Sequence, residues 1–383
     1  MHEFKDIKKI LVIKLRHIGD VLLSVPVFRT LRGTFPDAHI SVLVNAGTED
    51  VLNGNPLIDE IISFDRKIKD MHPPKKYLNE LLFLNGIRSK RFNMIVDLNG
   101  GDRPAIISFL SGARYRLGNS PVYSGFWRKY LYTHLAERDL LKHTILQNLD
   151  VIKEFGKKKK KPIVDIFIPE DAQKFAEKVF AGYGIKESDT VVHVHPTSRW
   201  FFKCGKDEYM AEVIKQLIEK GIKVVVTSSA DEREMDKAKK ILSLVNLRLL
   251  DLCGKTSIKH LAAVAKMSNL FIGVDSMPMH IAAAVNTPVI ALFGPTGAYN
   301  WGPWDNHSSE SRVRSLEFRN PYSKRNGIQT FGRHTVIQRD WECVPCGASG
   351  CNFTKISRCL EEITPQEIIE IAMHKLKETG KTS

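Results

Sequence analysis

Short runs of apolar residues recur along the chain, separated by stretches in which apolar residues follow a helical period. Such runs occupy residues 8–14, 39–44, 60–64, 93–98, 190–195, 223–228, 247–252, 269–274 and 288–294. Their length and their Val and Ile content are typical of buried strands. Helices are predicted between them, including residues 20–32, 207–219, 231–242 and 257–267. This alternation predicts βαβ units, and therefore parallel sheets with helices on both faces.

The alternation is interrupted once, by the five lysines of residues 157–161, and starts again beyond them. A chain of 383 residues is too long for one ordinary core. We therefore expect an α/β protein with two Rossmann-like domains that face each other across a cleft. The expected segments are an N-terminal domain (1–156), a basic linker (157–168), a C-terminal domain (169–363) and a final helix within 364–383. A helix over 143–155 closes the first domain, and the final helix is long enough to pack back across the cleft.

The apolar run 269–274 stops at Asp275 and is followed directly by a predicted helix. Pro278 suits the first turn of that helix, where its missing N–H costs nothing. A helix N-terminus at the carboxyl end of a parallel strand presents free N–H groups and a partial positive charge. This stretch therefore predicts a phosphate site.

A similar turn follows the first predicted strand, where Gly19 and Asp20 precede the helix over residues 20–32. Asp is a favoured N-cap, so capping alone would explain Asp20. The alternative is a carboxylate held at the edge of a ligand site.

Polar residues also collect after the run 93–98, in residues 97–102 and in Arg103. Further along, Arg114, Arg116 and Arg128 lie close in the sequence to the aromatic residues Tyr115, Tyr123 and Trp127. These side chains suit an anionic acceptor, and an ordinary surface explains them equally well.

The net charge is +14, divided as +6 in residues 1–156, +5 in 157–161 and +3 in the remainder. A solvated surface and attraction to an anionic membrane or substrate are both consistent with this excess. Nucleic acid is disfavoured, because no basic stretch is interleaved with stacking aromatics in a known binding motif. The N-terminus lacks a signal-peptide pattern, and no apolar run reaches the roughly 20 residues of a spanning helix, so we expect a cytoplasmic location.

Several nucleotide-binding motifs are absent. The dinucleotide fingerprint Gly-x-Gly-x-x-Gly follows neither first strand, which disfavours a dehydrogenase. Residues 254–257 resemble the end of a P-loop, but Leu249 stands where its first glycine would be. No Asp-x-Asp pair is present to hold a divalent ion, so a bound diphosphate would be neutralised by backbone dipoles and basic side chains.

Four of the six cysteines lie close together in the sequence, at Cys343, Cys346, Cys351 and Cys359. This spacing leaves three alternatives open, namely a structural zinc ion, free thiols and disulfides. A reducing compartment favours the first two over disulfides.

Three segments in order along the chain resemble the bacterial lipopolysaccharide heptosyltransferases of glycosyltransferase family 9. They are residues 10–20 (ILVIKLRHIGD), 273–284 (GVDSMPMHIAAA) and 291–296 (ALFGPT). Residues 338–351, with three of the clustered cysteines, resemble the branch called heptosyltransferase III.

The resemblance implies a GT-B fold and an inverting, metal-independent transfer of heptose from ADP-heptose to the lipopolysaccharide inner core. It implies that Asp20 is the general base and that Lys203 neutralises the departing ADP. The donor-binding residues it implies are Thr197, Ser198, Lys203, Glu232, Asp275, Ser276, Met277 and His280, with Asp231 as the alternative to Glu232. We assign His17, Gly19, Asn99 and Arg103 to the acceptor.

The acceptor class implies peripheral contact with the cytoplasmic face of the inner membrane. Two other functions remain open, a GT-B enzyme that uses a different nucleotide sugar and a nucleotide-binding homologue without activity. The presence of both Asp20 and Lys203 argues against the inactive homologue. The polar stretch over residues 306–336, within an expected insertion at about 305–360, is predicted to be a mobile loop.

Overall fold

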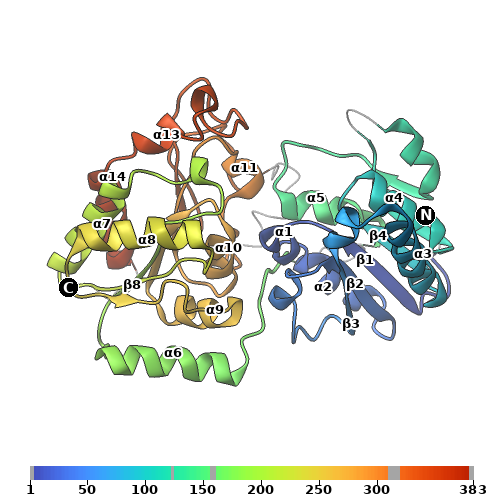
Figure 1. Cartoon of the computed structure of the whole chain (residues 1–383), viewed down its shortest axis with the longest axis horizontal. Coiled ribbons are helices and arrows are strands. Elements are labelled where there is room, and N and C mark those ends of the chain that lie inside the picture. Colours follow the sequence, from blue (N-terminus) through green and yellow to red (C-terminus); the bar gives the residue numbers. More distant parts are fainter. Residues whose placement is uncertain (1–3, 122–124, 156–160, 309–319, 379–383) are drawn as a thin grey trace. The chain divides into compact units, whose positions relative to one another are not determined.

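The computed structural model describes residues 4–121, 125–155, 161–308 and 320–378. The chain divides into two compact units, Met1–Phe167 and Ile168–Ser383 (Figure 1). Lysines 157–160 of the predicted basic linker lie outside the described residues. Each unit is built around one sheet, and each is described here by itself.

The first unit contains a six-stranded sheet in the order β3-β2-β1-β4-β5-β6, and every neighbouring pair is parallel. Its strands are β1 (Lys9–Lys14), β2 (His39–Asn45), β3 (Glu60–Phe64), β4 (Met94–Asp97), β5 (Tyr115–Asn119) and β6 (His134–Ala136). Its α-helices are α1 (Ile18–Leu22), α2 (Val25–Thr34), α3 (Pro73–Ser89), α4 (Asp102–Leu110) and α5 (Thr144–Asp150). Single 3-10 turns are η1 (Glu49–Val51), η2 (Arg66–Asp70), η3 (Phe126–Leu131) and η4 (Lys153–Phe155). The parallel sheet predicted from the sequence is confirmed.

The helix predicted over residues 20–32 is two helices, and Asp20 is not its N-cap. Helix α1 begins at Ile18, so that Asp20 lies inside its first turn and His17 is the N-cap. The chain breaks after Leu22 because Pro26 cannot donate an N–H to a preceding carbonyl. Ser24 marks the break, since its hydroxyl donates to the carbonyl of Val21 at 2.6 Å.

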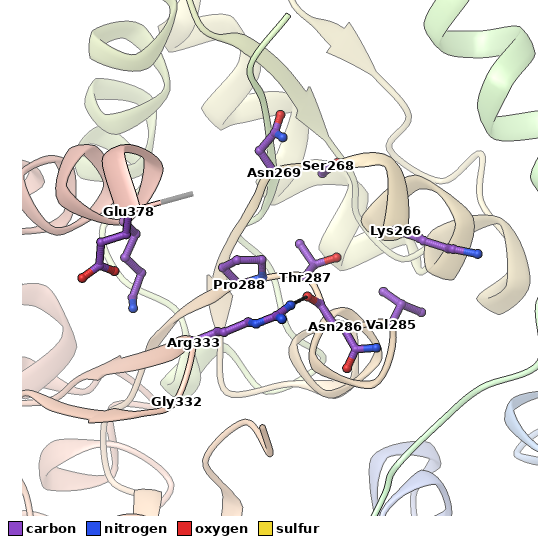
Figure 2. A pocket seen from close by; sticks show the side chains of 11 residues that line it. Lys266, Ser268, Asn269, Val285, Asn286, Thr287, Pro288, Gly332, Arg333 and Glu378 are labelled. Carbon is purple, nitrogen blue, oxygen red and sulfur yellow. Dashed lines mark hydrogen bonds between the residues drawn. The ribbon is translucent and has the colours of Figure 1, made fainter. Parts of the chain in front are cut away.

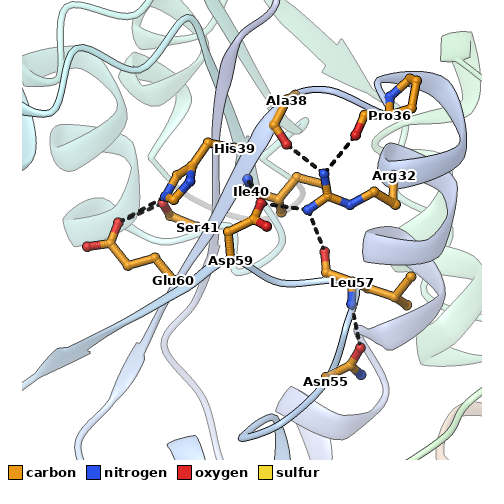
Figure 3. Close-up of polar contacts among 10 residues, drawn as sticks. All are labelled: Arg32, Pro36, Ala38, His39, Ile40, Ser41, Asn55, Leu57, Asp59 and Glu60. Carbon is orange, nitrogen blue, oxygen red and sulfur yellow. Dashed lines mark hydrogen bonds and ion pairs between the residues drawn. The ribbon is translucent and has the colours of Figure 1, made fainter.

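Arg32 fastens the end of α2 to the amino ends of β2 and β3 (Figure 3). Its guanidinium donates to the carbonyl of Ala38 at 2.7 Å and to Asp59 Oδ2 at 2.6 Å. The same Asp59 oxygen accepts the N–H of Ile40 at 2.7 Å. Burial works against ionisation, but the hydrogen bonds from Ile40 and Arg32 prevail and lower the pKa of Asp59.

The second unit contains a seven-stranded sheet in the order β12-β13-β11-β10-β7-β8-β9, parallel except for the edge pair β12 and β13. Its strands are β7 (Val191–His195), β8 (Lys223–Val226), β9 (Leu250–Asp251), β10 (Leu270–Val274), β11 (Val289–Leu292), β12 (Gln329–Phe331) and β13 (His334–Ile337). Its helices are α6 (Glu170–Tyr183), α7 (Asp207–Glu219), α8 (Glu232–Val245), α9 (Ile258–Met267), α10 (Met277–Ala284), α11 (Ala298–Trp301), α13 (Arg358–Glu361) and α14 (Pro365–Glu378). Two 3-10 turns are η5 (Phe201–Lys203) and η6 (Cys351–Phe353).

Alternate residues of the central strands pack on opposite faces of this sheet. Val192 and Val194 of β7 belong to a core that includes residues of α7, α8 and α14. Val191 of the same strand belongs to a second core with residues of α6 and α9. Burial on both faces explains why these strands read as continuous apolar runs in the sequence.

The polar stretch over residues 306–336 is not wholly a loop in its described part. It contains β12 and the start of β13, and Tyr322 is buried with its hydroxyl donating to the carbonyl of Pro303 at 2.7 Å. Aromatic residues explain this order, because Tyr322 and Phe331 pack edge to face, with Trp304 beside Phe331.

The last helix, α14, packs against α7 within its own unit. A capping box begins α14, since Thr364 N–H donates to Glu367 Oε2 at 2.9 Å and Glu367 N–H donates to Thr364 Oγ1 at 3.3 Å. Its packing across a cleft stays a prediction. Within the described residues, no helix has the length and apolar character needed to cross a membrane.

Candidate active site

The turn after β10 has the form that the sequence predicts. Strand β10 is buried throughout, and Ser276 in an extended conformation is the N-cap of α10, with a proline in its first turn. The N–H of Asp275 donates to the carbonyl of Leu292, which fixes the turn to the neighbouring strand β11 at 3.1 Å. The first N–H groups of α10 are thus placed at the carboxyl edge of the sheet.

Two other chain segments converge on the carboxylate of Asp275. Lys203 Nζ, at the end of η5, lies 2.6 Å from Asp275 Oδ2, and Thr296 Oγ1, after β11, donates to the same oxygen at 2.5 Å. The Asp275 side chain is 6% exposed and that of Lys203 is 20% exposed. An ammonium group has three donors, so Lys203 can bind Asp275 and still donate to a phosphate.

Thr197 and Ser198 follow β7 at the same edge of the sheet, and both are buried. Thr197 Oγ1 donates to Glu234 Oε2 at 2.9 Å. Burial raises the pKa of the Glu234 carboxyl, although the hydrogen bond from Thr197 opposes the shift. The sequence prediction had not included Glu234 or Thr296.

Asp231 and Glu232, the two alternatives for donor binding, differ in what they already bind. The Asp231 carboxylate caps α8 by accepting the N–H groups of Arg233 and Glu234 at 3.2 and 3.4 Å. Glu232 is exposed at the first position of the helix. Asp231 is therefore already engaged as the N-cap of α8.

Ser276, Met277 and His280 occupy the first two turns of α10. The Ser276 and Met277 side chains are half-buried, whereas His280 is buried at 6% exposure. Ser276 donates its hydroxyl to the carbonyl of Val274 at 3.4 Å, which holds the N-cap against the end of β10.

Asp20 in the first unit is half-buried on α1, beside the carboxyl end of β1. Electrostatic attraction joins it to Lys14, whose Nζ donates to the carbonyl of Leu98 and to Asn148 Oδ1, each at 3.1 Å. Burial lowers the pKa of Lys14 to about 8, and Asp20 opposes that shift. The sequence does contain a signal for Lys14, since a lysine at the end of a buried strand requires polar or charged partners.

The predicted acceptor residues follow β1 and β4, two neighbouring strands of the first sheet. Asn99 is buried, its amide donating to the carbonyl of Leu15 at 3.2 Å and its N–H to Asp97 at 2.7 Å. Arg103 instead donates to Glu80 on α3 at 2.6 Å and lies over the ring of Phe64. His17 is exposed, and Gly19 is in the first turn of α1.

Asp97, at the end of β4, is the buried acid beneath these loops. It accepts the hydroxyl of Tyr132 as well as the N–H groups of Asn99 and Gly100. Burial raises the pKa of Asp97 despite these donors. It therefore acts as a structural anchor for the loop after β4.

The four clustered cysteines are free thiols, as are Cys204 and Cys253, so disulfides are not formed. Burial raises the pKa of Cys359 to about 11, and the negative charge of Cys351, Cys346 and Cys343 adds to the shift. Cys359 therefore interacts electrostatically with the other three cysteines. Across the described parts of the chain, no group of three or more Cys, His, Asp or Glu side chains is arranged to hold a metal ion.

A cavity of about 520 Å³ lies elsewhere in the second unit (Figure 2). Asn269, Pro288 and Arg333 line it, and each directly precedes a strand, whereas Asp275 directly follows one. Arg333 donates to the carbonyl of Asn286 at 3.2 Å. The cavity is therefore at the amino edge of the sheet, opposite the edge that carries Asp275.

Two Rossmann-like units with helix N-termini and polar side chains at the carboxyl edges of their sheets define a GT-B fold. Residues 82–325 match the model of the family described as glycosyltransferase family 9 (heptosyltransferase). The chain belongs to this family and is a glycosyltransferase.

Individual relatives agree with this assignment. The chain is 32% identical over 296 residues to lipopolysaccharide heptosyltransferase 3 of Escherichia coli, an alignment that covers 76% of this chain and 85% of the relative. Its fold is similar to that of a family 9 glycosyltransferase from Veillonella parvula, with a TM-score of 0.77, 21% identity and coverage of 98% and 99% of the two chains. It is also similar to the E. coli heptosyltransferase WaaC solved with ADP-2-deoxy-2-fluoro heptose, with a TM-score of 0.69, 15% identity and coverage of 96% and 99%.

Proposed function

We propose that this enzyme transfers a heptose from ADP-heptose to the inner core of lipopolysaccharide, with inversion at the anomeric carbon and without a catalytic metal. The convergence of Lys203 and Thr296 on Asp275, beside the N-terminus of α10, carries the proposal. This arrangement offers an ammonium group and helix N–H groups to a diphosphate. The name of the E. coli relative supports heptose and lipopolysaccharide as substrates.

The proposed chemistry is a single displacement. The acceptor hydroxyl loses its proton to the carboxylate of Asp20 as its oxygen attacks the anomeric carbon. The bond to ADP breaks with its electron pair on the departing phosphate oxygen, and Lys203 stabilises the negative charge that develops there. Backside attack inverts the configuration of the anomeric carbon.

Within the donor site, we assign the diphosphate to Lys203, Ser276 and the N–H of Met277. Thr197 and Ser198 support this segment from the end of β7, and Glu232 is assigned to the ribose because Asp231 is occupied as an N-cap. His280, in the second turn of α10, completes the donor-binding set.

The first unit is assigned to the acceptor. Electrostatic attraction acts between Asp20 on α1 and the buried Lys14 at the end of β1. Because the carboxylate of Asp20 belongs to one unit and Lys203 to the other, transfer requires the two units to present their sites to the same substrate pair.

An acceptor embedded in a membrane also implies peripheral contact of the enzyme with the inner membrane. The net charge of +14 supports attraction to anionic headgroups.

A structural zinc ion at Cys343, Cys346, Cys351 and Cys359 stays a prediction. The electrostatic interaction of Cys359 with the other three cysteines supports it, and the raised pKa of Cys359 opposes it, since zinc binds thiolates. Metal analysis of purified enzyme decides the question, and a zinc content near zero would remove the idea.

Asp20→Asn tests the proposed mechanism, with ADP-heptose as donor and a truncated lipopolysaccharide as acceptor. We expect transfer to be lost while the dissociation constant for ADP changes by no more than a few-fold, because Asp20 and the donor site are in different units. Turnover close to that of the parent enzyme would show that Asp20 is not the base.

A further inference from the structure

The first unit exposes an unusual number of large apolar side chains on three neighbouring elements. On α3 these are Tyr77, Leu78, Leu81 and Leu82, on α4 Ile106, Phe109 and Leu110, and on η3 Phe126, Trp127 and Tyr130. Tyr77 is 70% exposed, Leu81 64% and Tyr130 73%. We call these ten residues the apolar face. Single exposed apolar residues are ordinary, but a group of this size marks an interaction site.

The spacing on α3 shows that its exposed residues share one side of the helix. Tyr77 and Leu81 are four residues apart, as are Leu78 and Leu82, and such pairs lie one above the other. The opposite side of the helix is also apolar, since Phe83 and Ile87 pack in the core of the unit. Helix α3 is therefore apolar both toward the core and away from it.

Specific contacts keep the three elements together. Helix α4 contacts both α3 and η3, and α3 and α4 are neighbours in Figure 1. Arg103 at the start of α4 pairs with Glu80 of α3 at 2.6 Å. Arg128 of η3 donates to the carbonyl of Gly100, just before α4, at 3.2 Å.

The charges around the apolar face are positive. The acidic residues on the three elements are Glu80 and Asp102, and they pair with Arg103 and Arg128, respectively. Lys75 and Arg88 are exposed near the two ends of α3, and Lys129 of η3 lies with its ammonium 5.0 Å from the ring centroid of Tyr130. Leucine and aromatic side chains flanked by lysine and arginine are typical of elements that lie in a membrane interface.

We propose that the apolar face docks the first unit onto a lipid bilayer that carries anionic headgroups. The apolar side chains enter the boundary between headgroups and acyl chains, and the flanking Lys and Arg residues bind the headgroups. This inference rests on the proposed function, because a glycolipid acceptor would be presented at such a surface. It assigns the unit that is proposed to bind the acceptor to the membrane.

Co-sedimentation of the full chain with phosphatidylcholine vesicles containing phosphatidylglycerol tests the docking. For the variant Leu78→Gln with Leu81→Gln we expect vesicle partitioning to fall by at least about tenfold. Gln is a good helix former, so α3 should persist. The matched control is Phe353→Gln, which removes a fully exposed aromatic residue from the second unit and should leave partitioning unchanged.

A second measurement separates docking from chemistry. Heptose transfer to a de-acylated, water-soluble acceptor should be the same in the parent enzyme and the Leu78→Gln, Leu81→Gln variant. Vesicle binding without transfer by the parent would refute the proposed function alone. Transfer without vesicle binding, or equal binding by parent and variant, would overturn the docking. The docking would also be overturned if the parent enzyme forms a dimer, does not bind vesicles, and becomes monomeric in the variant. The apolar face would then bind a second copy of the chain.

Discussion

Replacing Lys203 with Met should weaken ADP binding while leaving the rest of the donor site in place. The ammonium group holds Asp275 at 2.6 Å and keeps further donors for the diphosphate. A hydrogen bond to a charged group contributes about 1.5–3 kcal/mol, which corresponds to roughly a 10- to 100-fold change in the dissociation constant. Because 20% of the Lys203 side chain is exposed, water screens the contact and we expect the lower part of that range.

The same substitution removes the cationic partner of a nearly buried carboxylate, so stability must be measured separately from affinity. Lys203→Met leaves the Thr296 hydroxyl bound to Asp275 but removes the positive charge beside it, and it should lower the midpoint of thermal unfolding. Adding Asp275→Asn removes the unpaired charge and should recover part of that midpoint without recovering ADP affinity.

Isothermal titration of ADP into parent, single and double variants supplies the comparison. The control is Lys206→Met, since the Lys206 ammonium lies 4.8 Å from the ring centroid of Tyr209 and not at Asp275. An ADP dissociation constant for Lys203→Met within twofold of the parent value would refute the assignment of Lys203 to the diphosphate.

Three further predictions follow from single groups. Glu232→Gln should weaken ADP binding several-fold but leave the binding of inorganic pyrophosphate unchanged. If titration gives the same ADP affinity for parent and variant, Glu232 does not bind the ribose. The pKa of Lys14 is about 8 in the folded protein against an ordinary value of 10.5. Between these pH values the unfolded chain holds more protons than the folded protein. The free energy of unfolding should therefore rise with pH across that window, by about 3 kcal/mol. Lys14→Met should abolish this rise in denaturant unfolding, and an unchanged rise would assign it to another group. The hydrogen bond from Arg339 is the largest cause that lowers the pKa of Glu367 to about 2. The ionised Glu367 therefore stabilises the folded protein fully above pH 4.5, and this contribution is lost as the pH falls toward 2. The difference in unfolding midpoint between parent and Glu367→Gln should shrink over that range, and a constant difference would contradict the linkage.

The sequence was most informative where local pattern decides the structure. The buried run before Asp275 and the proline after it determine a strand, a turn and a helix start without help from distant residues. The carboxylates of the two turns, Asp20 and Asp275, are recognisable for the same reason. The surroundings of these two carboxylates cannot be recognised from the sequence, because Asp275 contacts Lys203 and Thr296 only once the sheet is formed.

The residues that were missed depend on tertiary placement. Glu234 is spaced four and seven residues from Ala238 and Ile241, both buried, so the sequence places this acid on the core face of α8. That position signals a buried partner, and the partner proves to be Thr197. The exposed apolar residues of α3 were equally hard to recognise, because the sequence does not show which of its apolar residues face the core.

The most direct test of the central claim is a donor screen with the purified enzyme, using truncated lipopolysaccharide acceptors and mass spectrometry of the product. The proposed function predicts that ADP-heptose is used and that the acceptor gains the mass of one heptose. A gain of one hexose from another nucleotide sugar, with none from ADP-heptose, would contradict it.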